Sequence, residues 1–327
     1  MAKLRLSLAC WDYDRTRALM DERVRPDGID LVYQPLEVEE TFFRQARHRE
    51  FDVAEMSFSS YCLSKWKDDP FVAIPVFPSR MFRHGNIWVN ERSGIREPAD
   101  LRGKRFACPE YQLTANVWIR GLLEDEYGVE PESVTYVTGG EEQPGRPEKL
   151  ALDLPPAFRV EPIAPDRTLS AMLASGEIDA FHGPRTPSTA NAPGVRRLFP
   201  DYVAAEKAYY AKTRIFPIMH VVVIRRDVYE RDRWVATALF KAFGEAQRYA
   251  YDDYRQTAAL KAMLPWSSAE AEATRALMGE AWWPYGVAGN EDVLETFTRY
   301  HHRQGLSPRR LSVRELFAPE TFETFAI

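Results

Sequence analysis

The sequence predicts a two-lobed α/β fold with a helical C-terminal part. Short apolar runs alternate with amphipathic stretches of about ten residues over the first 60 residues, and the alternation restarts after residue 90. From Asp227 onward the pattern is mostly helical and aromatic. Strands that alternate with such helices are typical of βαβ units and a mostly parallel sheet. A chain of 327 residues accommodates two such domains.

The first half of the pattern consists of strands, helices and one tight turn. In chain order we expect a strand over 4–10, a helix capped by Asp12 or Asp14 and extending to about Val24, a PDG turn at 26–28, a strand over 29–36, a helix over 38–49 and a strand over 51–56. The carboxyl ends of parallel strands are where open α/β sheets bind ligands.

The second half repeats the pattern with one long interruption. In chain order we expect a strand over 101–110, a helix over 112–128 with Gly128 as C-cap, a strand over 134–138, a helix and strand within 167–181, and an apolar strand over 216–224. Residues 139–166 are rich in Pro and Gly, so we expect an ordered excursion there without a core element.

Composition and motifs exclude several classes of function. A net charge of −5 disfavours nucleic acid and anionic membranes as partners. The chain has no GxxxxGK[ST], GxGxxG, HExxH or GxSxG motif. His301 and His302 are adjacent and therefore cannot form a metal pair at i,i+4. We expect no metal and no nucleotide cofactor.

The expected location is the cytoplasm. The apolar N-terminal stretch is too short and interrupted for a secretory signal, and the longest apolar run, IMHVVVI, is too short to span a membrane. Cys10, Cys62 and Cys108 are odd in number and widely spaced, which predicts reduced thiols.

A short internal echo pairs one position in each half. REFDVAEMS (49–57) and GEIDAFHGP (176–184) both end a helix and begin a strand, and alignment on their aspartates places Glu55 opposite His182. Both are polar residues near the carboxyl end of a strand, which makes each a candidate ligand contact.

The stretch FPSRMFRHGNIWVN (77–90) contains two guanidiniums and an imidazole beside apolar residues. Arg80, Arg83 and His84 suggest an anion clamp, in which arginine binds a carboxylate and histidine supplies a proton. The alternative is a solvated linker whose arginines pair with surface acids. Because aromatic residues flank the basic ones and a strand follows at once, we favour the clamp.

Three more segments offer candidate contacts. In EMSFSSY, Ser57 and Ser59 follow a strand and precede a helix, where hydroxyls and N–H groups converge on an anion or simply cap the helix. In PEYQLTANVW, Tyr111 and Thr114 form a similar arrangement, with packing and capping as the alternative.

Histidines complete the candidate set. His220 lies in an apolar strand-like run, where a single histidine is more often a core residue than a catalyst. His182 precedes Gly-Pro-Arg185. Three histidines (His84, His182 and His220) that converge would indicate chemistry.

Several blocks of the chain carry a family likeness. PVFPSRMFRHGNIWVN, DLRGKRFACPEYQLTANVWIRGLLEDEYGV, LASGEIDAFHGPRTP, FPIMHVVVIRRDVYE and WWPYGVAGNEDVLETFTRYHHRQGLS resemble the 4,5-dihydroxyphthalate decarboxylase family. The likeness implies a fold similar to type 2 periplasmic binding proteins, with two lobes joined by two crossings. We expect residues 1–83 plus 222–327 in one lobe and 84–221 in the other.

The resemblance implies a cofactor-independent, non-oxidative decarboxylase of a phthalate-type hydroxy-aromatic acid. His84 and His220 would transfer protons, and Arg80 and Arg83 would bind carboxylate. Glu55 and His182 would hold the phenolic edge, and Ser57, Ser59, Tyr111, Thr114 and Arg185 would complete the pocket.

Two other functions stay open at this point. A solute-binding protein for a small anionic or aromatic ligand would share the fold, as would a biosynthetic enzyme that acts on a pyrimidine precursor or a menaquinone intermediate. The only partner expected is the small aromatic carboxylate, and homo-oligomer formation is left open.

Overall fold

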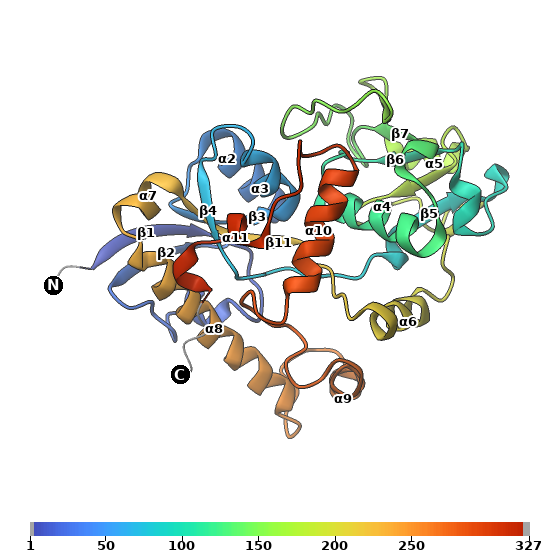
Figure 1. Ribbon diagram of the computed structural model, residues 1–327. Coiled ribbons are helices and arrows are strands. Elements are labelled where there is room, and N and C mark those ends of the chain that lie inside the picture. Colours follow the sequence, from blue (N-terminus) through green and yellow to red (C-terminus); the bar gives the residue numbers. More distant parts are fainter. Residues whose placement is uncertain (1–2, 323–327) are drawn as a thin grey trace. The chain divides into compact units, whose positions relative to one another are not determined.

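The computed structural model describes residues 3–322 and divides into two compact units (Figure 1). Within the described residues, unit 1 takes in 3–80, 218–294 and 312–322, and unit 2 takes in 81–217 and 295–311. Compared with the expected lobes, both points at which the chain passes from one unit to the other lie a few residues earlier. In addition, residues 295–311 belong to unit 2. Residues 1–2 and 323–327, which the expected first lobe included, lie outside the described residues.

Unit 1 is built on a five-stranded sheet with the strand order β2-β1-β3-β11-β4. Its strands are β1 (Leu4–Ala9), β2 (Ile29–Gln34), β3 (Val53–Ser57), β4 (Phe71–Ile74) and β11 (His220–Arg225). β1 pairs in parallel with β2 and β3, whereas β11 is antiparallel to both β3 and β4. The carboxyl ends of β1 to β4 therefore lie at the sheet edge where β11 begins.

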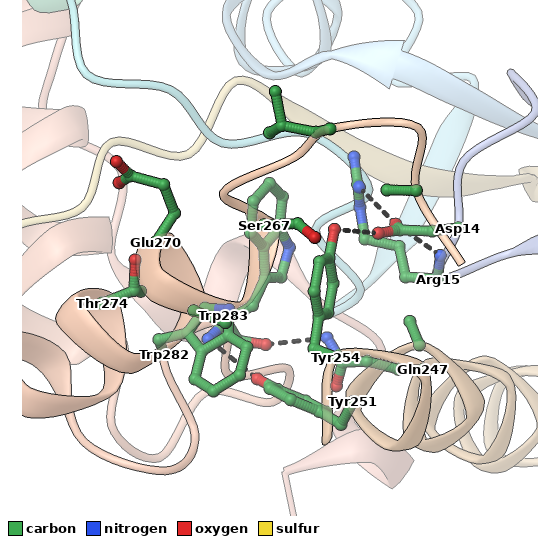
Figure 2. Close-up of a pocket in the computed structure, with 14 residues that line it drawn as sticks. Asp14, Arg15, Gln247, Tyr251, Tyr254, Ser267, Glu270, Thr274, Trp282 and Trp283 are labelled. Atoms are coloured by element: carbon green, nitrogen blue, oxygen red, sulfur yellow. Dashed lines mark hydrogen bonds and ion pairs between the residues drawn. The ribbon is translucent and has the colours of Figure 1, made fainter. Parts of the chain in front are cut away.

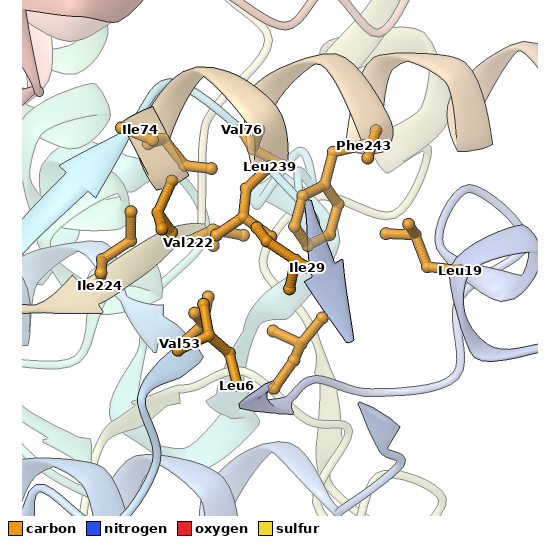
Figure 3. Packing of buried hydrophobic residues seen from close by; sticks show 14 of the residues in the cluster. Leu6, Leu19, Ile29, Val53, Ile74, Val76, Val222, Ile224, Leu239 and Phe243 are labelled. Carbon is orange, nitrogen blue, oxygen red and sulfur yellow. The ribbon is translucent and has the colours of Figure 1, made fainter. Parts of the chain in front are cut away.

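Unit 1 also contains several helices. They are α1 (Arg17–Met20), α2 (Val38–His48), α3 (Phe58–Ser64), α7 (Arg226–Arg231), α8 (Trp234–Arg255), α9 (Ser267–Met278) and α11 (Val313–Leu316), with the 3₁₀ turn η5 (Pro319–Thr321). The apolar stripe of α8, which includes Leu239 and Phe243, packs on sheet residues such as Val53 and Val222 (Figure 3). Removing one such side chain costs about 2–5 kcal/mol.

The expected helix from Asp12 or Asp14 to Val24 is wrong in extent, since α1 covers only Arg17–Met20. Before it the chain turns, with the Tyr13 N–H donating to the Trp11 carbonyl at 3.0 Å. After it Glu22 adopts a left-handed conformation (φ 62°), which a helix cannot continue through. The aspartates therefore mark a turn that brings side chains to the sheet edge.

Unit 2 contains a six-stranded sheet with the strand order β10-β5-β9-β6-β7-β8. Its strands are β5 (Ile87–Asn90), β6 (Arg105–Cys108), β7 (Thr135–Thr138), β8 (Arg159–Pro162), β9 (Ala180–His182) and β10 (Val195–Arg197). Its α-helices are α4 (Thr114–Tyr127), α5 (Leu169–Ser175), α6 (Tyr202–Thr213) and most of α10 (Glu291–Arg303); its 3₁₀ turns are η1 (His84–Asn86), η2 (Glu91–Ser93), η3 (Pro98–Leu101) and η4 (Pro131–Ser133).

The Pro- and Gly-rich excursion contributes one strand that we did not expect. Residues Arg159–Pro162 form β8, which pairs in parallel with β7 at the edge of the sheet. Its side chains are exposed or half-buried. A polar edge strand that ends in proline has no hydrophobic alternation to reveal it.

The same excursion is anchored by a buried ion cluster. The Glu110 carboxylate accepts from Lys149 Nζ at 2.6 Å and from Arg146 at 2.7 Å. Burial alone would raise the pKa of Glu110, but the two cations outweigh it and hold that pKa below its usual value.

The C-cap expected at Gly128 is confirmed by its left-handed φ of 65°.

No helix within residues 3–322 is both long and apolar enough to cross a membrane.

Candidate functional site

Glu55 is a fully buried carboxylate in the middle of the unit 1 sheet. It lies on β3 between β1 and β11, and its oxygens accept hydrogen bonds from both sides. Oε2 accepts from the Trp11 N–H at 3.1 Å and contacts Cys10 Sγ at 3.6 Å; Oε1 accepts from the Tyr13 hydroxyl at 2.7 Å. A buried carboxylate with this many donors is held in one orientation.

His220 is the imidazole partner of Glu55. Its Nδ1 lies 2.5 Å from Glu55 Oε1, and the edge of Phe42 packs against its ring with centroids 4.8 Å apart. Burial alone would raise the pKa of Glu55, but the His220 charge and the bonds from His220, Tyr13 and Trp11 together lower it. The His220 side chain is 17% exposed, so part of it is accessible.

β-Pairing places one further predicted residue, Ser57, beside this pair, and Ser59 follows it in the chain. His220 is opposite Ser57 in the register between β11 and β3. Ser57 is the N-cap of α3, and its hydroxyl accepts from the Ser60 N–H at 3.5 Å. Ser59 follows, fully buried, in the first turn of α3. The capping role that we held open for Ser57 is thus observed.

Arg80 is buried and contacts neutral groups of unit 1. Its Nη2 donates to the Pro284 carbonyl at 2.8 Å and also to Asn290 Oδ1. The guanidinium lies 5.1 Å from the centre of the Phe77 ring. Asn290 Nδ2 in turn donates to the carbonyls of Pro284 and Gly286, at 3.1 and 2.8 Å. Arg80 therefore fixes the loop that precedes α10.

Arg83 and His84 belong to unit 2 and are both buried. Arg83 donates to the Pro184 carbonyl at 3.2 Å, which brings it to the loop between His182 and Arg185. Burial lowers the pKa of Arg83 to about 10, and the nearby Glu206 carboxylate partly offsets this. The His84 ring packs on Phe199 and Tyr209, and burial lowers its pKa to about 4.

His182 is the last residue of β9 and is fully buried. Its ring lies 4.1 Å from that of Phe106, and neither ring nitrogen has a hydrogen-bond partner among the described residues. Burial first, and the Arg120 charge second, lower the pKa of His182 well below its usual value. The structure thus places a neutral imidazole in an aromatic environment within unit 2.

The remaining predicted contacts also belong to unit 2. Tyr111 is fully buried; its hydroxyl donates to the Gln304 carbonyl at 3.1 Å, and the Arg120 guanidinium lies 3.8 Å from its ring centre. Thr114 is the first residue of α4, whose N-cap is Leu113. Arg185 is exposed. Tyr111 therefore packs within unit 2, as the alternative interpretation held.

Two residues in the turn before α1 escaped the sequence interpretation. Tyr13 contacts Glu55, and Arg15 stacks its guanidinium on Tyr13 at 4.1 Å and on Trp283 at 4.2 Å. Arg15 lines a cavity of about 310 Å³ in unit 1 (Figure 2). The run WDYDR follows the first strand directly, so its place at the carboxyl edge was a usable signal.

Within residues 3–322, no three His, Cys, Asp or Glu side chains are grouped in a way that would hold a metal ion.

Comparisons with known proteins give two curated relatives with the same description. The chain is 43% identical over 330 residues to the 4,5-dihydroxyphthalate decarboxylase of Comamonas testosteroni, with 100% of both chains covered. It is 47% identical over 213 residues to that of Pseudomonas putida, with 64% of this chain and 83% of the other covered. No protein-family model matches the chain.

Solved structures share the fold at low identity. The periplasmic aliphatic sulphonate-binding protein SsuA from Escherichia coli aligns with a TM-score of 0.50 at 14% identity, covering 98% of this chain and 99% of its own. A periplasmic sulfonate-binding SsuA from Methylobacillus flagellatus aligns at 0.51 and 14%, covering 98% and 93%. The predicted periplasmic-binding-protein-like fold is thereby confirmed, as a fold alone.

Proposed function

The chain belongs to the 4,5-dihydroxyphthalate decarboxylase family, and we propose that it decarboxylates 4,5-dihydroxyphthalate without oxidation, giving protocatechuate and CO₂. The family expected from the sequence is confirmed by the relative that is 43% identical over the full length. The substrate follows from what the two relatives are described as acting on.

The reaction replaces one carboxylate of the ring by a proton. A proton adds to the ring carbon that bears the carboxylate, while the hydroxyl para to that carbon supplies electron density. The bond to the carboxylate carbon then breaks, its electron pair returns to the ring, and CO₂ leaves. Because the ring itself holds the electrons, the step needs a proton donor but no separate electron sink. We therefore propose catalysis without a cofactor.

The contact between Glu55 and His220 is the observation that carries this proposal. A carboxylate oxygen 2.5 Å from Nδ1 fixes the proton on that nitrogen and leaves Nε2 for the substrate. In the protonated ring, Nε2–H is the group that delivers the proton, and solvent restores it after turnover. General acid catalysis of this kind contributes about 10²–10⁴-fold in rate.

The other roles drawn from the resemblance stay predictions. They are carboxylate binding by Arg80 and Arg83, proton transfer by His84, and substrate contacts from Ser57, Ser59, Tyr111, Thr114, His182 and Arg185. Burial keeps His84 neutral at pH 7, since its pKa is lowered to about 4, so it suits the part of a base or hydrogen-bond partner better than that of an acid. The cytoplasmic location also stays a prediction.

The direct test is product analysis with EDTA-treated protein and 4,5-dihydroxyphthalate. We expect equimolar CO₂ and protocatechuate, and a loss of about 10²-fold or more in kcat in His220→Gln. His48→Gln is the matched control, because His48 is an exposed residue at the end of α2. Tight binding without CO₂ release would replace the proposal by a solute-binding function. Full turnover in His220→Gln would remove His220 from the mechanism.

A further inference from the structure

The cavity of Figure 2 lies between two helices of unit 1, and each helix presents a distinct face to it. α8 contributes Gln247, Tyr251 and Tyr254, at spacings of four and three residues that place them on one face. α9 contributes Ser267, Glu270 and Thr274 at spacings of three and four. The volume of about 310 Å³ suits a ligand with a single ring.

The aromatic wall of this cavity is fixed before any ligand arrives. Trp283 is bound at three points: its N–H donates to the Tyr251 hydroxyl at 2.9 Å, its carbonyl accepts from Gln247 at 2.8 Å, and its indole N–H donates to the Phe77 carbonyl at 2.8 Å. The Trp282 ring packs edge-on against Tyr251, with centroids 4.7 Å apart. A preorganised wall spares the ligand the cost of ordering side chains.

One end of the cavity carries a rigid guanidinium. Arg15 is held between the rings of Tyr13 and Trp283, and its Nε donates to the Pro78 carbonyl at 2.5 Å. Its Nη1 donates to Asp14 Oδ1 at 2.9 Å. Asp14 also accepts from the Tyr254 hydroxyl at 2.8 Å, which spreads its charge over two donors.

Acceptors lie on the α9 side. Glu270 and Thr274 are drawn well away from Arg15 in Figure 2. The cavity therefore has the Arg15 guanidinium, paired with Asp14, on one side, the Glu270 carboxylate on the other and aromatic rings between. A planar molecule with a carboxylate at one end and hydroxyls at the other complements this pattern.

We propose that this cavity binds a hydroxy-aromatic carboxylate, with Arg15 on the carboxylate, Glu270 accepting from the phenolic hydroxyls and the ring against Trp282 and Trp283. The choice of ligand class rests on the proposed function, whose substrate and product both have this shape. The site is separate from Glu55 and joined to it by two contacts: Arg15 stacks on Tyr13, and Tyr13 donates to Glu55.

Isothermal titration calorimetry of the full chain with three non-reacting probes tests the two ends of the cavity separately. Protocatechuate carries both groups, benzoate lacks the hydroxyls, and catechol lacks the carboxylate. We expect Arg15→Met to weaken protocatechuate and benzoate about tenfold or more and to leave catechol within about twofold. Glu270→Gln should weaken protocatechuate and catechol about threefold or more and spare benzoate.

Two matched controls and a second arginine variant distinguish a specific loss of binding from a loss of folding. Arg25→Met and Glu272→Gln change exposed residues of the same types that do not line the cavity, and should leave all three affinities unchanged. Arg15→Lys keeps the charge but not the planar fork, and should fall between wild type and Arg15→Met. Equal loss of all three probes in Arg15→Met, or no loss in either cavity variant, overturns the proposal.

Turnover of 4,5-dihydroxyphthalate, measured on the same samples, separates the two hypotheses. Normal turnover with no dependence of probe binding on Arg15 or Glu270 rejects the cavity site and leaves the proposed function intact. The expected pattern of probe affinities without any turnover does the reverse.

Discussion

The carboxylate of Glu55 and the imidazole of His220 are 2.5 Å apart although the residues are separated by 165 positions in the sequence. The Tyr13 hydroxyl reaches the same carboxylate oxygen at 2.7 Å. The His220 ring is therefore oriented by a carboxylate that is itself fixed by hydrogen bonds. Such support keeps a proton donor in a fixed position relative to its substrate.

Glu55→Gln should lower kcat by about 10²-fold while binding of the substrate changes little. An amide at this position can present N–H to Nδ1 and so favour the wrong tautomer, as in other histidine–carboxylate pairs. Steady-state kinetics at pH 7 tests this, with the exposed Glu40→Gln on α2 as control. An unchanged kcat in Glu55→Gln would show that the pair is structural.

Glu55 should also make stability depend on acid pH. Its pKa is lowered in the folded state, so its contribution to the free energy of unfolding is present above the unfolded glutamate pKa of about 4.3 and is lost as pH falls through the folded value. The difference in free energy of unfolding between wild type and Glu55→Gln should therefore shrink below pH ~4. Urea denaturation over a pH series measures it; a constant difference down to pH ~2 would contradict the prediction.

Protonation of His84 should reduce the free energy of unfolding in a higher pH range than protonation of Glu55 does. Burial lowers its pKa to about 4, whereas an unfolded histidine titrates near 6.5, so the unfolded chain binds a proton that the folded chain refuses between these values. Stability should fall as pH drops from ~6.5 to ~4, by at most about 3 kcal/mol from this residue.

The comparison for His84 is His84→Gln, whose stability should vary less across that window. His182 adds a slope of its own, because burial lowers its pKa in the same direction. The measured quantity is therefore the difference between variant and wild type at each pH. Identical slopes would mean that the pKa of His84 is the same in the folded and the unfolded chain.

Asn290→Ala and Arg80→Lys together separate the structural role of Arg80 from its predicted role in binding the substrate carboxylate. Asn290→Ala removes an acceptor from the buried Arg80 Nη2 and two donor bonds to the 284–286 loop, so we expect a loss of about 1–3 kcal/mol in the free energy of unfolding. Arg80→Lys should show the same loss and, if Arg80 also binds the substrate carboxylate, a raised KM. Loss of stability with an unchanged KM in Arg80→Lys would leave Arg80 a purely structural residue.

Gly121 and Gly244 form a matched pair of glycine-to-alanine tests in helices. A Cβ on Gly121 would lie 2.2 Å from the Tyr300 ring, which Asp125 holds through a 2.6 Å hydrogen bond. Gly121→Ala should therefore destabilise by about 1–3 kcal/mol. A Cβ on Gly244 meets nothing within 4 Å, so Gly244→Ala on α8 should stabilise by up to about 1 kcal/mol. Thermal denaturation of both variants gives the two signs directly.

The sequence predicted the alternation of strands and helices, because buried strands such as β3 and β11 are mostly apolar. The prediction missed β8, because this polar edge strand shows no alternation of apolar and polar residues. It made α1 too long, because Asp12 and Asp14 resemble helix caps. Among single residues it singled out both Glu55 and His220, each as a polar residue in an apolar strand. Their contact could not be predicted, since it depends on the antiparallel insertion of β11 beside β3.

Tyr13 and Arg15 show what local patterns cannot supply. The residue types in WDYDR do not distinguish a surface turn from one whose tyrosine reaches a buried carboxylate, and the one usable signal was the position of the run directly after the first strand. The tertiary position of the turn, at the end of β1, decides it.

The place of β11 between β3 and β4 has a consequence for biosynthesis. Glu55 leaves the ribosome long before the strand that brings its imidazole partner, and all of residues 81–217 are made in between. Until His220 has emerged, the nascent first unit lacks a middle strand of its sheet and the imidazole partner of its buried carboxylate. A chain that ends before residue 220 would lack this imidazole, and we expect it to be inactive although it contains residues 81–217 of unit 2.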